Sequence, residues 1–175
     1  MGKYFFLSLL AGILFSCSDG DLQIETIDFD SVAIQFCTAP QTSVKNIMFK
    51  INDDEALILE LQSGVLNKGV VGETIITESS VPSQSQVTYR IFSDAVTKNY
   101  FCDAIPTTEP TVVDEIEAED GTVIIQTVAN EDNTEFVHTI QLSGISFVTD
   151  TDERITDLTI SEFGEVTTAV PAPAE

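Results

Sequence analysis

The sequence predicts an all-β protein, either an antiparallel β-sandwich or, as the alternative, a β-barrel. Apolar residues recur at every second position along the body of the chain, which is the period of a strand with one buried face. Residues that favour turns separate these segments at short intervals, and runs with helical periodicity are scarce. Short strands at this spacing are typical of antiparallel sandwiches and barrels.

Six segments show this alternation, and in each of them we expect the apolar residues to share one face. In chain order they are Val32, Ile34 and Phe36; Ile47, Phe49 and Ile51; Leu57, Leu59 and Leu61; Val87, Tyr89 and Ile91; Val123, Ile125 and Thr127; and Phe136, His138, Ile140 and Leu142. Both Tyr89 and Tyr100 fall in strand-like segments. Turns are expected at 52–54, 67–69, 120–121 and 130–133, where Asn, Asp or Gly residues occur.

The expected organisation is a signal-peptide helix at 1–16, an acidic tether at 17–21, one β-rich domain at 22–165 and a disordered tail at 166–175. The segment 105–111 contains two prolines, which favour an extended connector, and we interpret it as a crossover within the domain. Two smaller domains joined at this segment are the alternative.

The first residues have the pattern of an export signal. Lys3 is followed by about twelve uncharged residues, 4–15, whereas a membrane-crossing helix needs roughly 20. The run ends in Leu14-Phe15-Ser16-Cys17, which resembles the lipobox of bacterial lipoproteins. The resemblance implies that signal peptidase cleaves before Cys17 and that the cysteine carries diacylglyceryl and an N-linked acyl chain such as palmitate. An ordinary signal peptide cut near Ser16 is the alternative.

The residues after this cysteine suggest a destination. Ser18-Asp19-Gly20-Asp21 resembles the acidic export tag of surface lipoproteins of the Bacteroidota. This resemblance implies attachment to the outer membrane with exposure at the cell surface, and the periplasmic face is the alternative. Further segments resemble uncharacterised flavobacterial cell-envelope lipoproteins. These are Tyr100-Phe101-Cys102, the proline-containing connector, 121–125 and 138–142.

The charge of the chain excludes some partners. The formal net charge is −22, and removal of residues 1–16 takes away Lys3 and no acid, which leaves −23. Such a field repels phosphate backbones and anionic headgroups, so we expect no nucleic-acid partner and membrane contact only through the lipid on Cys17.

The three cysteines divide into one that is lipidated and one pair. If Cys17 carries lipid, Cys37 and Cys102 remain, and an exported protein can form disulfides. We therefore expect a Cys37–Cys102 bridge, with two buried free thiols as the alternative.

The sequence contains few residues in patterns suited to catalysis, and we predict no catalytic or cofactor-binding residues. His138 is the only histidine and lies in phase with core residues, where we expect it to be packed and hydrogen-bonded. Nucleophile elbows, phosphate-binding glycine loops and zinc motifs are absent. Structural calcium is the one metal considered, at the acidic segments 53–55, 131–133 and 150–153, although none has EF-hand spacing.

One candidate modification site completes the set. Asp30-Ser31-Val32 resembles the O-glycosylation acceptor of the Bacteroidota, with Ser31 as the acceptor. Together these observations predict a lipid-anchored cell-envelope lipoprotein that binds an unidentified protein or polymer, or serves as a structural accessory, without enzymatic activity. The alternative is a small carboxylate-dependent hydrolase acting on a polysaccharide.

Overall fold

The computed structural model describes residues 27–105, 107–149, 154–155 and 161–171. Strands make up 52% of the described residues and helix 4%, which confirms the all-β prediction. The elements are β1 Asn46–Asn52, β2 Glu55–Leu61, β3 Ile75–Ser80, β4 Ser85–Phe92, α1 Lys98–Cys102, β5 Val112–Ala129, β6 Glu135–Val148, β7 Arg154–Ile155 and β8 Glu162–Ala169. The predicted signal peptide and acidic tether lie outside the described residues.

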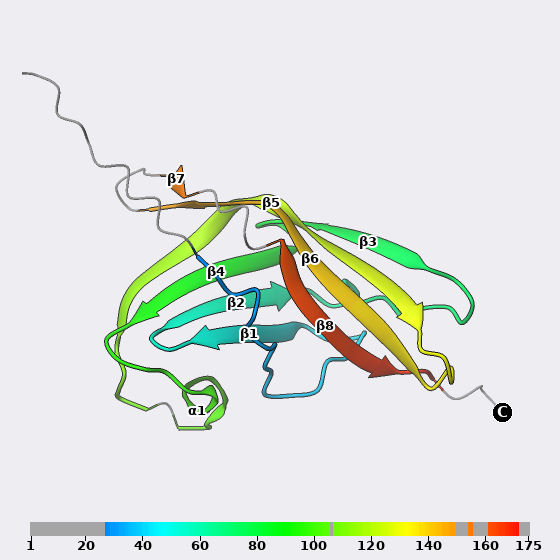
Figure 1. Ribbon diagram of the computed structural model, residues 1–175, viewed down its shortest axis with the longest axis horizontal. Coiled ribbons are helices and arrows are strands. Elements are labelled where there is room, and N and C mark those ends of the chain that lie inside the picture. Colours follow the sequence, from blue (N-terminus) through cyan, green and yellow to red (C-terminus); the bar gives the residue numbers. More distant parts are fainter. Residues whose placement is uncertain (1–26, 106, 150–153, 156–160, 172–175) are drawn as a thin grey trace, which may run out of the picture.

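The strands form one antiparallel sheet that curls into a half-barrel (Figure 1). Its order is β1-β2-β4-β5-β6-β7, with β3 also paired to β5 and β8 also paired to β6. The two layers expected of a sandwich are therefore two parts of a single sheet. One part contains β1, β2, β4 and the start of β5, and the other contains β3, the end of β5, β6 and β8.

The long strand β5 connects these two parts. Its first residues pair with β4 and its later residues pair with β3, so β3 and β4 follow each other along one edge of β5. The register against β6 shifts around Asp120, and the next residue, Gly121, has a φ of 134°. Only glycine adopts such a backbone conformation readily, so Gly121 allows β5 to bend where it passes from one part of the sheet to the other.

The main core lies inside the curl and takes residues from both parts of the sheet. Leu57, Leu59 and Leu61 of β2 belong to the same buried cluster as Val123 and Ile125 of β5. The cluster also contains Ile140 and Leu142 of β6. His138, on the same face of β6, is fully buried as well. The predicted buried faces of β2, β4, β5 and β6 are thus confirmed.

Ile47, Phe49 and Ile51 share one face of β1, as expected, but this face is the outer one. Met48 and Lys50, on the opposite face, point towards the main core. Both faces of β1 are partly covered, so alternation alone does not identify the face that packs in the main core.

A second apolar cluster covers part of this outer face. It contains Phe49, Ala56, Ile58, Phe92 and Val96, with Tyr100 and Phe101 of α1 packed against it. The rings of Phe49 and Phe101 stack with centroids 4.4 Å apart. Tyr100 therefore lies in a short helix rather than in the predicted strand, because its ring and that of Phe101 both turn towards one sheet face.

Two further expectations are corrected. Residues 32–36 form no strand but one bridge between Gln35 and Phe49. We name residues 27–37 the strap, because this segment lies between β1 and β8, with Ile34 against Gly164. The predicted tail at 166 begins too early, since β8 extends to Ala169 and buries Val166 and Thr168.

The bend at Gly121 gives a prediction. A Cβ atom on Gly121 would lie 2.6 Å from Cδ1 and 3.0 Å from Cα of Ile145, whereas one on Gly64 would meet nothing within 4 Å. Both glycines have positive φ, so each alanine variant carries a backbone strain of about 1–2 kcal/mol. We expect overpacking in Gly121→Ala to lower the free energy of unfolding by a further ~1–3 kcal/mol. Denaturant unfolding of both variants measures this difference. Equal losses in the two variants would contradict a crowded bend.

Candidate functional site

The lipidation site predicted at Cys17 lies outside the described residues, as do Asp19 and Asp21 of the predicted export tag. In the part of the chain that the structure describes, no helix has the length and apolar character needed to cross a membrane.

The predicted disulfide is present. Cys37 and Cys102 are bonded, with their Cα atoms 5.2 Å apart. Cys37 ends the strap and Cys102 ends α1, so the bond connects the segment beside the β1 edge to the helix on the outer face. Both the strap and α1 have few hydrogen bonds to the sheet, and the covalent link holds them together.

Ser31 lies at the surface in a turn of the strap. The main-chain N–H of Val32 donates to the carbonyl of Phe29, and the carboxylate of Asp28 accepts from the N–H of Asp30. The Ser31 side chain is exposed, so a modifying enzyme can reach it. Its glycosylation stays a prediction.

Two of the acidic segments considered for calcium form turns between strands. At 53–55, the carbonyls of Asp53 and Asp54 accept hydrogen bonds from Val96 and Phe92, and Glu55 accepts the hydroxyl of Tyr89 at 2.5 Å. At 131–133 the chain makes the β5–β6 hairpin turn. Within the described ranges, no three His, Cys, Asp or Glu side chains gather in a way that could hold a metal ion. The third segment, 150–153, lies outside them.

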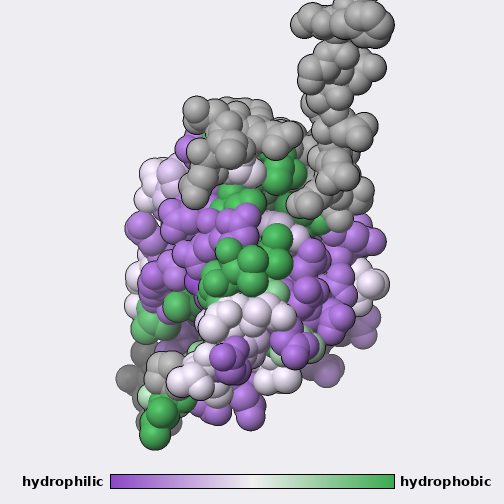
Figure 2. All heavy atoms as spheres, turned by 90° about the vertical axis from the view of Figure 1, so that its left-hand side faces the viewer, coloured by the Kyte–Doolittle hydropathy of each residue, from purple (hydrophilic) through white to green (hydrophobic). Residues whose placement is uncertain are grey.

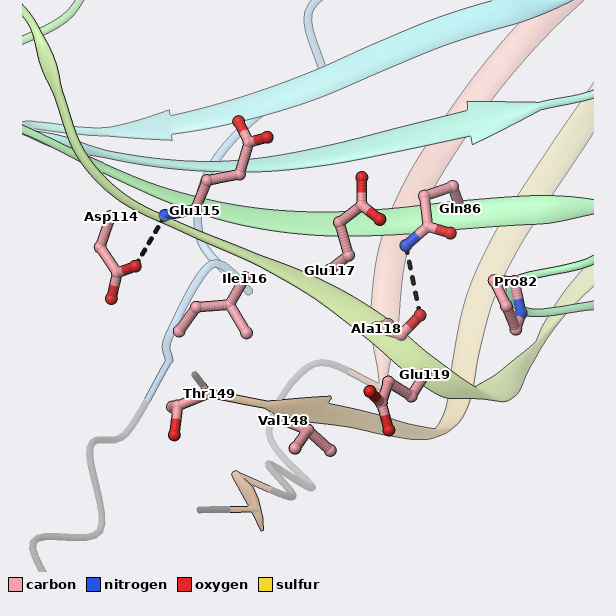
Figure 3. Close-up of a pocket in the computed structure, with 10 residues that line it drawn as sticks. All are labelled: Pro82, Gln86, Asp114, Glu115, Ile116, Glu117, Ala118, Glu119, Val148 and Thr149. Atoms are coloured by element: carbon pink, nitrogen blue, oxygen red, sulfur yellow. Dashed lines mark hydrogen bonds between the residues drawn. The ribbon is translucent and has the colours of Figure 1, made fainter. Parts of the chain in front are cut away.

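An acidic cleft of about 650 Å³ runs along the first half of β5 (Figure 3). Glu115 and Glu117 point to one side of the strand, and Asp114 and Glu119 point to the other. All four carboxylates are exposed. Carboxyl-based glycoside hydrolysis needs two carboxylates that converge on one bond. Glu115 and Glu117 share a side of the strand, but both are exposed, and Glu115 is paired with Arg90.

His138 lies in a buried polar network, as expected. Its Nδ1 is 2.8 Å from the Thr127 hydroxyl, and its Nε2 is 2.8 Å from the Thr168 hydroxyl. Asn67 donates to the same Thr127 oxygen. The imidazole is thus held between two threonine hydroxyls inside the core. Burial lowers the pKa of His138, and the network is inaccessible to a substrate.

Lys50 lies buried at the seam where the strap meets β1 and β8. Its Nζ donates to the carbonyl of Phe29 at 2.7 Å, reaches the carbonyl of Glu162 at 3.4 Å and lies 5.5 Å from the centre of the Phe163 ring. Burial lowers the pKa of Lys50, and nearby carboxylates such as Asp30 oppose that shift. The ammonium group thus joins three segments that no continuous hydrogen-bonded ladder connects.

The most distinctive surface is a groove of about 640 Å³ on the outer face of β1, β2 and β4, which we name the outer-face groove. Its lining residues are Cys37, Thr38, Ala39, Gln41, Val44, Lys45, Asn46, Ile47, Phe49, Ile58, Glu60, Arg90 and Phe101. The groove begins at the apolar cluster under α1 and extends over a part of the sheet that α1 does not cover. Its volume is within the range of ligand pockets.

Two cations border the apolar floor of this groove. Lys45 pairs with Glu60 at 2.5 Å, and Arg90 pairs with Glu115 through both Nε and one terminal nitrogen. Val44 and Ile47 are 43% and 47% exposed, so their apolar surface is available to a partner.

Other exposed apolar side chains occur at the start of β5, where Val112 and Val113 are exposed. Figure 2 faces the side that carries α1 and the start of β5, and it shows apolar groups surrounded by hydrophilic surface. Such exposed apolar patches are candidate contact sites.

Sequence reasoning missed the outer-face groove. Lys45 and Arg90 are far apart in the chain, and only the β1-β2-β4 pairing brings them to one face. The one available signal was the alternation of β1, in which Lys45 and Ile47 share a face.

Comparisons with known proteins add no relative. No protein-family model matches the chain, and searches of curated proteins and of solved structures returned no match. The site must therefore be interpreted from its own geometry.

The disulfide gives a stability prediction. Cys37 and Cys102 are 65 residues apart, so in the chain-entropy model their bond stabilises the fold by up to about 4 kcal/mol. We expect the Cys37→Ala/Cys102→Ala double variant, in a Cys17→Ser background, to lose most of this free energy of unfolding in urea. A double variant as stable as its background would contradict the prediction.

His138 gives a pH prediction. Because its pKa is lowered in the folded state, the unfolded chain binds more protons on acidification. The stability contributed by neutral His138 is complete above the unfolded pKa of about 6.5 and falls below it, by at most about 1.4 kcal/mol per pH unit. We expect the difference in unfolding free energy between wild type and His138→Gln to shrink from pH 8 to pH 5.5. A difference independent of pH would show that protonation of His138 does not oppose folding.

Proposed function

We propose that the protein is a lipid-anchored lipoprotein of the outer membrane, displayed at the cell surface, that acts as a non-enzymatic binding module. The observation that carries the location is Leu14-Phe15-Ser16-Cys17 after a short apolar run, followed by Asp19 and Asp21. The anchor would be the acyl chains on Cys17. Two or three chains on one residue suffice for stable attachment, since a single chain binds only marginally.

The binding role is supported by the outer-face groove. It combines exposed apolar side chains with two cations, which is the composition of a recognition surface. The acidic cleft on β5 offers exposed carboxylates, one of them paired with Arg90, and so gives the alternative hydrolase no specific support.

Metabolic labelling with a palmitate analogue tests the anchor. We expect the wild-type chain to incorporate the label and to fractionate with membranes, because acyl transfer requires the Cys17 thiol and the amine freed by cleavage. Cys17→Ser should lose both properties, whereas the matched control Cys37→Ser/Cys102→Ser should keep them.

Protease treatment of intact cells tests the face of the membrane. Degradation of the domain in unbroken cells is expected for surface display, and protection until the outer membrane is opened would place it on the periplasmic face. Labelling that persists in Cys17→Ser, or a wild-type chain released as a soluble protein, would contradict the proposed anchor.

A further inference from the structure

We propose that the outer-face groove binds an extended acidic segment of a partner protein, which adds as a strand to the edge of β1. This inference rests on the proposed binding role and assigns its site and the chemistry of its partner.

The first support is an open position on the β1 edge. Phe49 exchanges two main-chain hydrogen bonds with Gln35 of the strap, at 2.8 and 2.9 Å. Phe49 thus directs its N–H and C=O away from β2. Because these directions alternate along a strand and β1 pairs with β2 without a register shift, Ile47 directs its N–H and C=O to the same side.

The strap forms no hydrogen bond with this next position. Gln35 is the residue that bridges to β1, the chain next bonds β1 through Gln41 and the Asn46 side chain, and in the described residues no hydrogen bond is formed by the outward N–H or C=O of Ile47. An open strand edge binds extended peptides through main-chain hydrogen bonds, while neighbouring pockets receive alternate side chains.

The second support is the apolar floor beside this edge. The Ile47 side chain is 47% exposed, and Ile58 and Phe101 line the groove next to it. A strand added at Ile47 would direct every second side chain onto this floor, because side chains alternate across a strand. An apolar residue at that position of the partner would bury surface on both molecules.

The third support is charge. Arg90 directs two of its nitrogens to a single oxygen of Glu115, so several of its five N–H donors are free for a ligand carboxylate. The pair of Lys45 and Glu60 is exposed, and exposed pairs exchange partners at little cost.

The acidity of the rest of the molecule makes this charge pattern selective. Apart from buried Lys50, no cation lines the other described cavities, and the net charge is −22. Within the described residues, the outer-face groove is thus the one of these cavities with exposed cations that an acidic segment can reach. Screening beyond about 8 Å at physiological ionic strength limits the interaction to nearby charges, so an acidic segment must replace Glu60 on Lys45 or use the remaining N–H donors of Arg90.

A small amphipathic acid could use the apolar floor and the cations, but it would leave the main-chain groups of Ile47 unused. The open edge therefore favours a peptide over a lipid-like ligand.

Fluorescence polarisation with designed peptides tests the inference on the full-length protein in detergent. The probe is fluorescein-labelled Glu-Val-Phe-Val-Glu, and the charge-reversed peptide Lys-Val-Phe-Val-Lys should bind at least about tenfold more weakly. Methylation of backbone nitrogens should abolish binding at one set of alternate positions and spare the other, since only one edge of the peptide faces β1.

A matched pair of variants locates the site. Ile47 and Ile76 are both exposed isoleucines on strands, but Ile76 lies on β3, outside the groove. Ile47→Asp should weaken the glutamate peptide about tenfold or more, whereas Ile76→Asp, with the same added charge, should change binding by less than about twofold. Unchanged melting temperatures would show that both variants fold.

The outcomes separate this inference from the proposed function. No binding of the glutamate peptide at about 1 mM, equal binding of both peptides, or equal effects of the two aspartate variants would overturn the inference. Competition by decanoate together with indifference to N-methylation would assign the groove to small amphipathic acids and would also overturn it. None of these results would alter labelling at Cys17, on which the proposed location depends.

Discussion

The fold depends on one constraint, which is the bend of β5 at Gly121. An 18-residue strand that continued straight would hold β4 and β3 in one open sheet, with the apolar faces of β2 and β6 exposed to water. Because Gly121 adopts a φ of 134° and the register against β6 shifts beside it, the sheet curls so that its two parts face each other. Leucines of β2 and isoleucines of β5 and β6 then share one core, and this shared burial is the main source of stability.

Closing the sheet leaves a gap between β1 and β8, and the strap fills it. Lys50 of β1 donates to main-chain carbonyls of the strap and of β8, Gln35 bridges to β1, and the disulfide at Cys37 fixes the end of the strap to α1. The strap pairs with β1 only at Phe49, and α1 covers only part of the outer face. The outer-face groove is the part of this surface that the strap and α1 leave uncovered. The groove therefore lies on the rigid sheet.

Alternation along the chain predicted the strands that have one buried and one more solvated face, such as the end of β5 and β6, because burial there follows a period of two. It identified the apolar face of β1 but not that this face lies outside the main core, since α1 covers part of the outer face and Lys50 is buried on the inner one. The segment that ends at Cys102 is too short for its sequence pattern to distinguish a helix from a strand. It forms a helix in which the Phe101 ring stacks on Phe49. The cysteine pair was predictable from the chemistry of export, whereas the groove required the strand order, which local sequence does not contain.

Native-state hydrogen exchange tests most directly whether the bend in β5 makes the two parts of the sheet one cooperative unit. In low concentrations of denaturant, backbone amides in β2 and in β6 should exchange with the same free energy of opening, equal to that of global unfolding, because neither part keeps its core without the other. Opening of β1, β2 and β4 at a free energy well below that of β3, β6 and β8 would contradict a shared core.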